Sequence, residues 1–126
     1  MGYVRADILL SNPRDGKIAS LKVNALVDTG SLMLCVPEHI KTQLGLQELE
    51  KREISTADGK RDVVSYCGPV QIRFESRNCF TGALVLGDEV LLGAVPLEDL
   101  DLVVLTGKRI LTVNPDYPNM PHALVK

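Results

Sequence analysis

The feature that most constrains this chain is an apolar segment that runs directly into an acid, a glycine and two hydroxyl residues, Leu26-Val27-Asp28-Thr29-Gly30-Ser31. Gly30 has no Cβ, so the backbone can turn sharply just after a strand. The hydroxyls of Thr29 and Ser31 can donate hydrogen bonds to a carboxylate. The segment therefore predicts a tight turn that presents the Asp28 side chain. The sequence contains no second Asp-Thr-Gly or Asp-Ser-Gly.

Length and composition predict a single domain. The chain has 126 residues, of which 45% are hydrophobic, enough for one buried core. The net charge is -2 and no basic cluster, Lys60-Arg61 included, is longer than two residues, so we expect no nucleic-acid or anionic-membrane partner. No apolar run approaches the length of a membrane span, and the N-terminus lacks the pattern of a secretory signal. We therefore expect a cytoplasmic protein.

The three cysteines do not predict a metal site. Cys35, Cys67 and Cys79 have no Cys-x-x-Cys spacing, and only His39 and His122 could add imidazole ligands. Neither histidine stands in a recognisable cysteine-peptidase context. We expect three reduced, buried thiols, no metal and no cofactor.

Alternation of apolar residues between turn signals predicts a mainly β fold. Short helices are expected over residues 37–44, with Pro37 in the first turn, and over residues 95–100. Pro69 predicts an edge or a bend, because proline cannot donate to a β-ladder. The mixed-charge segment 48–53 is expected to be solvated. The expected strands cover residues 4–10, 17–27, 32–36, 52–56, 62–66, 70–74, 80–86, 89–93, 101–105 and 109–113.

Differences in composition divide the chain into two segments. Residues 1–113 carry the strand and helix pattern and are expected to form one domain. Residues 114–126 contain Pro115, Pro118 and Pro121, which prevent regular strand pairing and predict an extended tail.

Three motifs in a fixed order give the chain a family resemblance. Ala25-Leu26-Val27-Asp28-Thr29-Gly30-Ser31 comes first, the hairpin tip Ala57-Asp58-Gly59 second, and Leu91-Leu92-Gly93 before a short helix third. Each motif alone is typical of an ordinary turn or core strand. Together they resemble the retropepsins, the single-domain homodimeric relatives of pepsin that include retroviral proteases. The resemblance covers residues 4–113.

This resemblance implies a closed retropepsin-like β-barrel whose active site lies across a twofold axis. Asp28 would be the catalytic acid of each subunit, and Ser31 would hydrogen-bond to it. Thr29 would reach across the axis, and Gly30 would let the backbone approach the acid. The tip Ala57-Asp58-Gly59-Lys60 would be the flap that closes over a bound peptide.

The third motif would support the catalytic loop. In retropepsins two apolar residues and a glycine, here Leu91-Leu92-Gly93, pack beside this loop. Ala94 departs from the family, because many members have an arginine or another polar residue there. The walls of the cleft would include Val27, Leu32 and Val63, which favours hydrophobic side chains beside the cleaved bond.

The sequence therefore predicts a homodimeric aspartic endopeptidase that hydrolyses peptide or protein substrates with activated water. The alternative is a non-catalytic dimeric module that uses the same fold to bind peptides. Retention of Asp28 between two hydroxyl residues favours catalysis, because peptide binding alone does not require this acid.

Overall fold

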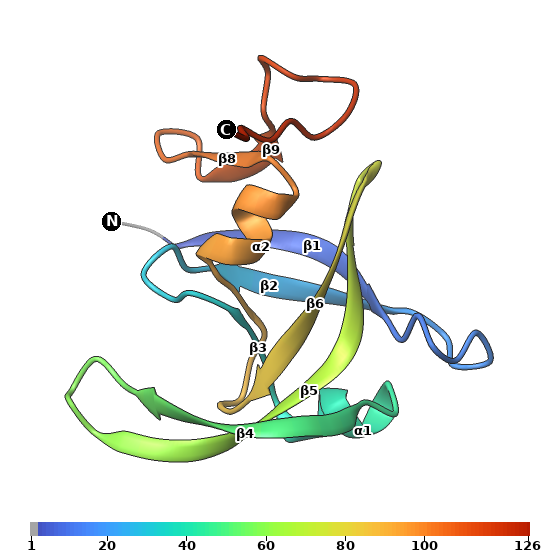
Figure 1. Cartoon of the computed structure of the whole chain (residues 1–126). Coiled ribbons are helices and arrows are strands. Elements are labelled where there is room, and N and C mark those ends of the chain that lie inside the picture. The colour runs from blue at the N-terminus through green and yellow to red at the C-terminus, as the bar shows by residue number, and fades with distance from the viewer. Residues whose placement is uncertain (1–2) are drawn as a thin grey trace.

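The structure is a computed structural model that describes residues 3–126 (Figure 1). Nine strands and two short helices occur in this part of the chain. In chain order they are β1 (Val4–Ser11), β2 (Leu21–Val27), β3 (Leu34–Val36), α1 (Glu38–Gln43), β4 (Gln47–Ser55), β5 (Arg61–Phe74), β6 (Arg77–Val85), β7 (Leu91–Leu92), α2 (Ala94–Asp99), β8 (Leu102–Leu105) and β9 (Ile110–Val113).

Six of the strands close into a barrel. The seven-stranded sheet has the order β1-β2-β7-β3-β6-β5-β4, and β1 also pairs with β5. This extra pairing joins the two sides of the sheet and leaves β4 outside the ring as the partner of the long strand β5. Strands β8 and β9 form a separate two-stranded sheet after α2. The predicted mainly β fold, a closed barrel with two short helices, is confirmed.

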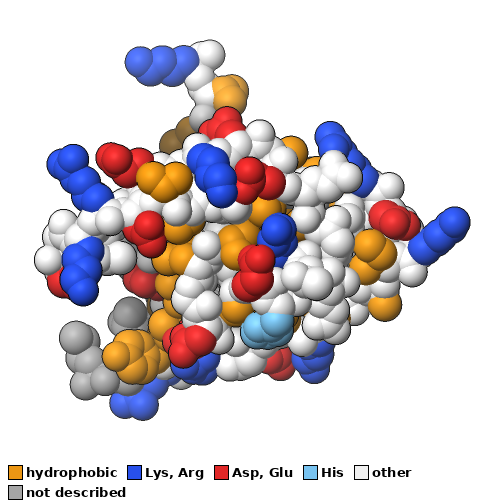
Figure 2. All heavy atoms as spheres, turned by 90° about the horizontal axis from the view of Figure 1, so that it is seen from below, with side chains coloured by type: hydrophobic (Ala, Val, Ile, Leu, Met, Phe, Trp, Pro, Cys, Tyr) orange, Lys and Arg blue, Asp and Glu red, His pale blue; other side chains and the backbone are white. Residues whose placement is uncertain are grey.

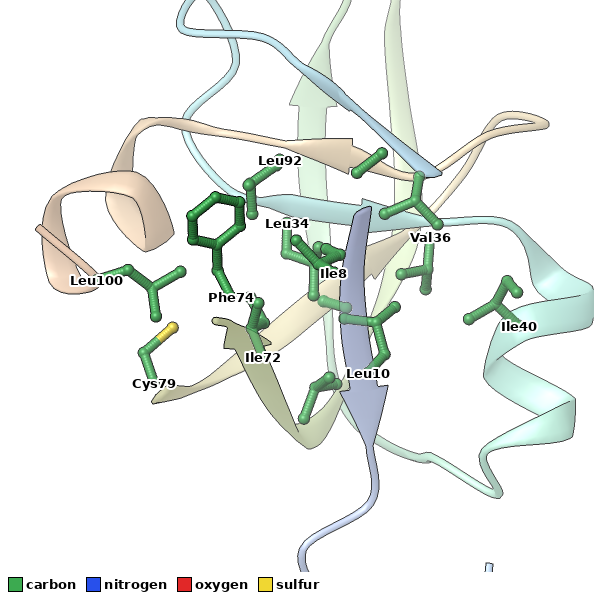
Figure 3. Packing of buried hydrophobic residues seen from close by; sticks show 14 of the residues in the cluster. Ile8, Leu10, Leu34, Val36, Ile40, Ile72, Phe74, Cys79, Leu92 and Leu100 are labelled. Carbon is green, nitrogen blue, oxygen red and sulfur yellow. The ribbon is translucent and has the colours of Figure 1, made fainter. Parts of the chain in front are cut away.

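The barrel interior is filled by alternating side chains. In β1, Ala6, Ile8 and Leu10 are buried while the residues between them are more exposed, as expected for a strand with one face on the core. Full burial of a side chain such as Leu10 stabilises the fold by roughly 2 kcal/mol. Figure 3 shows Ile8 and Leu10 among side chains from the other barrel strands, with Ile40 of α1 at one end and Leu100 beside α2 at the other.

Several element boundaries differ from the sequence prediction. Strand β2 begins at Leu21 rather than at residue 17, because the Ile18 amide donates to the Asp15 carbonyl and closes a turn there. Strand β3 begins at Leu34, and Leu32 lies outside it with 65% of its surface exposed, so the predicted start of this strand at residue 32 is wrong. The charged segment 48–53 is solvated, but it is part of β4.

Pro69 lies inside β5, where the pairing with β6 is irregular between Cys67 and Val70. The interruption predicted at this proline is therefore a local shift of register within one continuous strand.

Residues 114–122 fold back onto the barrel through a buried arginine. Arg77, at the start of β6, is only 1% exposed. Its Nη1 donates to the carbonyls of Leu100 (3.0 Å) and Asp101 (3.3 Å), and its Nη2 donates to the carbonyl of Tyr117. The Asp101 carboxylate is 3.9 Å from Arg77 Nη1. This cation is therefore compensated by carbonyl and carboxylate oxygens, as a buried charge requires.

Asp101 completes this contact, which we call the tail clasp (Arg77, Asp101, Asn114, Tyr117 and His122). The Asp101 carboxylate accepts hydrogen bonds from the Asn114 side-chain amide and from the His122 backbone N–H, both at 3.0 Å. The rings of Tyr117 and His122 are stacked with 3.9 Å between their centroids. Residues 114–126 contain no helix or strand, and the tail clasp fixes the path of their first nine residues, 114–122.

We expect Asp101→Asn to destabilise the fold at neutral pH and to matter little in strong acid. Hydrogen bonds from Asn114 and from the His122 backbone hold the pKa of Asp101 below its ordinary value, and Arg77 acts in the same direction. A carboxyl group with a depressed folded-state pKa stabilises the fold above its unfolded-state pKa. This contribution is lost as the pH falls through the folded-state pKa. The urea unfolding midpoints of the wild type and of Asp101→Asn should therefore converge as the pH falls below about 4. A gap that stays constant into strong acid would contradict this account.

No helix in residues 3–126 is both long and apolar enough to cross a membrane.

Candidate active site

Asp28 directly follows β2 and is fixed by backbone hydrogen bonds to the neighbouring strand. β2 pairs in parallel with β7, with Leu26 opposite Leu91 and Val27 opposite Leu92. The Asp28 backbone N–H donates to the Leu92 carbonyl at 3.0 Å. The two strands have only this short parallel contact, and it places residue 28 at the point where the chain leaves the sheet.

The loop itself orients the Asp28 carboxylate. Its Oδ1 accepts a hydrogen bond from the Gly30 backbone N–H at 3.0 Å, and its Oδ2 accepts one from Ser31 Oγ at 2.9 Å. The Ser31 N–H also donates to the Asp28 carbonyl at 3.1 Å, which closes the turn. Asp28 is half-buried, whereas Thr29 and Gly30 are exposed. A carboxylate has about four lone-pair positions, so this one can accept further donors.

Gly93 lies where a side chain cannot fit. A Cβ at this position would be 2.4 Å from the Met33 carbonyl oxygen and 2.7 Å from that of Ser31, and both are backbone atoms. The next two residues continue the contact, because Ala94 N–H donates to Ser31 O and Val95 N–H donates to Leu32 O, both at 2.8 Å. The start of α2 therefore holds the segment that follows Asp28, and the structure brings residues 28–31 and 91–93 together.

The tip Ala57-Asp58-Gly59-Lys60 connects β4 and β5 at the end of a hairpin that projects from the barrel (Figure 1). Gly59 has φ 86°, a conformation that favours glycine. The Asp58 carboxylate accepts hydrogen bonds from the Thr56 hydroxyl and the Lys60 backbone N–H, which lower the pKa of Asp58. The tip is thus an ordered turn, on the same side of Figure 1 as the loop that contains residues 28–33.

A hollow of about 550 Å³ lies beside this hairpin. Ile54, Val64 and Leu86 give it apolar walls, and Lys60 and Asp62 add charged groups. Val64 lines the hollow, whereas Val63 is 58% exposed and points to the opposite face of the hairpin. Val63 therefore does not line this hollow, and its place in the wall of the substrate cleft stays a prediction.

A larger hollow of about 710 Å³ lies beside α1, where Pro37, His39 and Asp88 contribute to its lining. It contains none of the predicted site residues. On the face shown in Figure 2, positive and negative side chains are interspersed around hydrophobic ones, and neither sign predominates.

The cysteines do not supply a nucleophile beside Asp28. Cys35, Cys67 and Cys79 are buried and free of disulfides. Burial raises the pKa of Cys35, and the nearby Asp28 raises it further. Burial likewise raises the pKa of Cys79 to about 12. These groups are therefore thiols, which are poor nucleophiles, at any ordinary pH. Residues 3–126 contain no cluster of side chains that could hold a metal ion.

The family model for aspartyl proteases matches residues 15–114, well over half of the chain. The chain belongs to this family. Aspartyl proteases are aspartic-type endopeptidases, and this is therefore the activity class of the chain. No curated protein sequence matches it significantly.

Two solved viral structures have the same retropepsin-like fold. An EIAV protease, solved in complex with the inhibitor HBY-793, has a TM-score of 0.57 and 23% identity, over 79% of this chain and 88% of that chain. The simian foamy virus (mac) protease has a TM-score of 0.50 and 17% identity, over 73% of this chain and 91% of that chain. At these sequence identities, the comparison shows that the two viral proteases share their fold with this aspartyl protease.

Sequence reasoning did not single out two arginines that the structure makes prominent. Arg77 forms the tail clasp, and Arg52 of β4 contacts the segment after the Asp28 loop. Both stand in strand segments among polar residues, where an arginine usually faces solvent. No local signal in the sequence distinguishes them.

Proposed function

We propose that this aspartyl protease acts as a homodimer in which two copies of Asp28 together activate water for peptide-bond hydrolysis. The observation that carries the proposal is the Asp28 carboxylate, held at the end of β2 by Gly30 and Ser31 in a chain of this family. The sequence offers one such acid, so a second chain supplies the other. By the family pattern, Thr29 contacts the partner's loop across the axis.

The proposed chemistry needs two carboxyl groups in different protonation states. Like charges held close together cannot both ionise easily, so the pair shares one proton. The ionised group then takes a proton from water while the protonated group polarises the scissile carbonyl. Water attacks directly, without a covalent acyl-enzyme, a metal or an organic cofactor. Activity is therefore expected to be highest in the acidic range.

Exposed apolar residues beside the Asp28 loop support a second copy as the partner. Leu32 is 65% exposed and Val95 is 44% exposed, and the hydrogen bond from Val95 N–H to Leu32 O places them side by side. Leu105 and Ile110, at the end of the β8–β9 hairpin, are also about two-fifths exposed, at 39% and 43%. Adjacent exposed hydrophobic residues are typical of protein interfaces.

The substrate is proposed to be a peptide in extended conformation under the flap of residues 57–60. Main-chain hydrogen bonds would hold it as an added strand, and pockets would select alternate side chains. The apolar groups Val27, Leu32 and Val64 favour hydrophobic residues next to the cleaved bond.

A peptide-library digest tests this function. We expect cleavage between hydrophobic residues, a rate maximum at acidic pH, inhibition by a statine-type compound and no effect of a metal chelator. A rate that rises steadily into alkaline pH would contradict the shared-proton mechanism. Peptide binding without cleavage at any pH would instead favour the non-catalytic dimeric peptide-binding module.

A further inference from the structure

Arg52 connects the β4–β5 hairpin, which ends in the flap, to the segment that follows Asp28. Its Nη1 is 3.5 Å from the sulfur of Met33, five residues after the candidate catalytic acid. Its guanidinium carbon lies over the Tyr66 ring, 3.7 Å from the ring centroid, a cation–π contact that positions the group. Tyr66 in turn packs on Gly82, where any Cβ would overlap the ring. The guanidinium is therefore held between Tyr66 of β5 and Met33.

The side chain of Arg52 lies on the hollow side of the hairpin. Arg52 pairs with Val64, and Ile54 pairs with Asp62. Directly opposed residues share one face of an antiparallel pair, as do residues two apart in one strand. Ile54, Asp62 and Val64 all line the 550 Å³ hollow, so Arg52 occupies the same face at the end nearer Met33.

Arg52 keeps strong donors free for a ligand. A guanidinium has five N–H donors. Its Nε donates to Glu50 at 2.7 Å, and a thioether such as that of Met33 is only a weak acceptor. The side chains of Arg52 and Glu50 are 38% and 56% exposed, and such pairs contribute little to stability. A second carboxylate can therefore bind this guanidinium without displacing a strong interaction.

The other charges of the hollow do not provide the same recognition. Lys60 and Arg61 are exposed near the tip, opposite in sign to Asp58 and Asp62. The two acids accept backbone hydrogen bonds from Lys60 and Val63 respectively. With positive and negative groups in equal number, selectivity for an acidic group depends on directed hydrogen bonds rather than on a long-range field. Arg52 has the fixed planar fork that such bonds need.

We propose that Arg52 is a specificity-determining residue that selects a substrate with Asp or Glu at one defined position. This inference rests on the proposed peptidase function. The acidic residue binds the guanidinium where it lies between Tyr66 and Met33. A residue two positions away along the extended peptide places an apolar side chain against Ile54 and Val64, because alternate side chains of a strand share a face.

The test starts from a peptide that the wild-type protein cleaves. Each position on both sides of the cleaved bond is replaced in turn by Glu and by its neutral isostere Gln, and kcat/KM is measured for every pair. We expect a preference for Glu of about tenfold at one position, the size of a charge-assisted hydrogen bond. Arg52→Gln should abolish this preference, and Arg52→Lys should restore part of it. Arg73→Gln is the matched control, since Arg73 is an exposed arginine of β5 whose Nε donates to the Glu75 carbonyl.

The outcomes separate the inference from the function on which it rests. If the wild type cleaves peptides but shows no Glu preference at any position, the role of Arg52 is overturned while the peptidase function stands. If Arg52→Gln slows Glu and Gln peptides equally, Arg52 only positions the flap, and the inference is again overturned. If the wild type cleaves no peptide, the proposed function itself is wrong.

Discussion

Replacing Asp28 by Asn is expected to abolish peptide hydrolysis while leaving the fold intact. The amide oxygen can accept the hydrogen bond that the Gly30 N–H donates to Oδ1, and the amide NH2 can donate to Ser31 Oγ in place of Oδ2, so the loop should keep its geometry. An amide cannot take a proton from water, and two amides cannot share a proton between them. We expect kcat to fall by more than about 10³-fold, because general acid and base catalysis are lost together.

The controls for this variant separate chemistry from stability. The urea midpoint of Asp28→Asn should stay close to that of the wild type. Asp15→Asn is a matched substitution in the turn before β2, where the carboxylate accepts a hydrogen bond from the Lys17 N–H, and it should retain activity. Equal hydrolysis by wild type and Asp28→Asn would reject Asp28 as the catalytic acid.

Gly93→Ala is expected to reduce both stability and activity strongly. The added Cβ would overlap backbone atoms of Ser31 and Met33, which cannot rotate away as a side chain can. Either α2 or the Asp28 loop must move. Overpacking of this kind costs about 1–3 kcal/mol or more of unfolding free energy. Chemical denaturation measures this loss, and kcat/KM measures the displacement of the acid.

Gly107→Ala is the matched control for this prediction. Gly107 lies between β8 and β9, and a Cβ there would meet no atom within 4 Å. The unfolding free energy of Gly107→Ala should differ from that of the wild type by less than about 0.5 kcal/mol. If Gly93→Ala behaved like Gly107→Ala, the contact between α2 and the loop would not be the support that we describe.

The barrel could be predicted because its determinants are local. Alternation in residues such as Ala6, Ile8 and Leu10 identifies strands, and turn residues such as Gly59 identify their connections. The position of each motif in this order then indicates the retropepsin-like fold. The hydrogen bonds of Ser31 with Asp28 also lie within four residues, where sequence spacing fixes the geometry.

The contacts that sequence reasoning could not predict join distant segments. Arg77 donates to the Tyr117 carbonyl 40 residues away, and Arg52 of β4 contacts Met33, 19 residues before it. An arginine within a strand has no local pattern that separates a buried role from an exposed one. Val64 of the hollow was missed for another reason, because adjacent residues of a strand lie on opposite faces and the sequence pattern singled out its neighbour Val63.

Each active site is proposed to need Asp28 from two chains. Wild type and Asp28→Asn are mixed in equal amounts, unfolded together in urea and refolded, so that the chains pair at random. We expect activity per wild-type chain to fall to about half, because mixed dimers contain only one acid. Unchanged activity per wild-type chain would contradict it, since each chain would then work with its own single carboxylate.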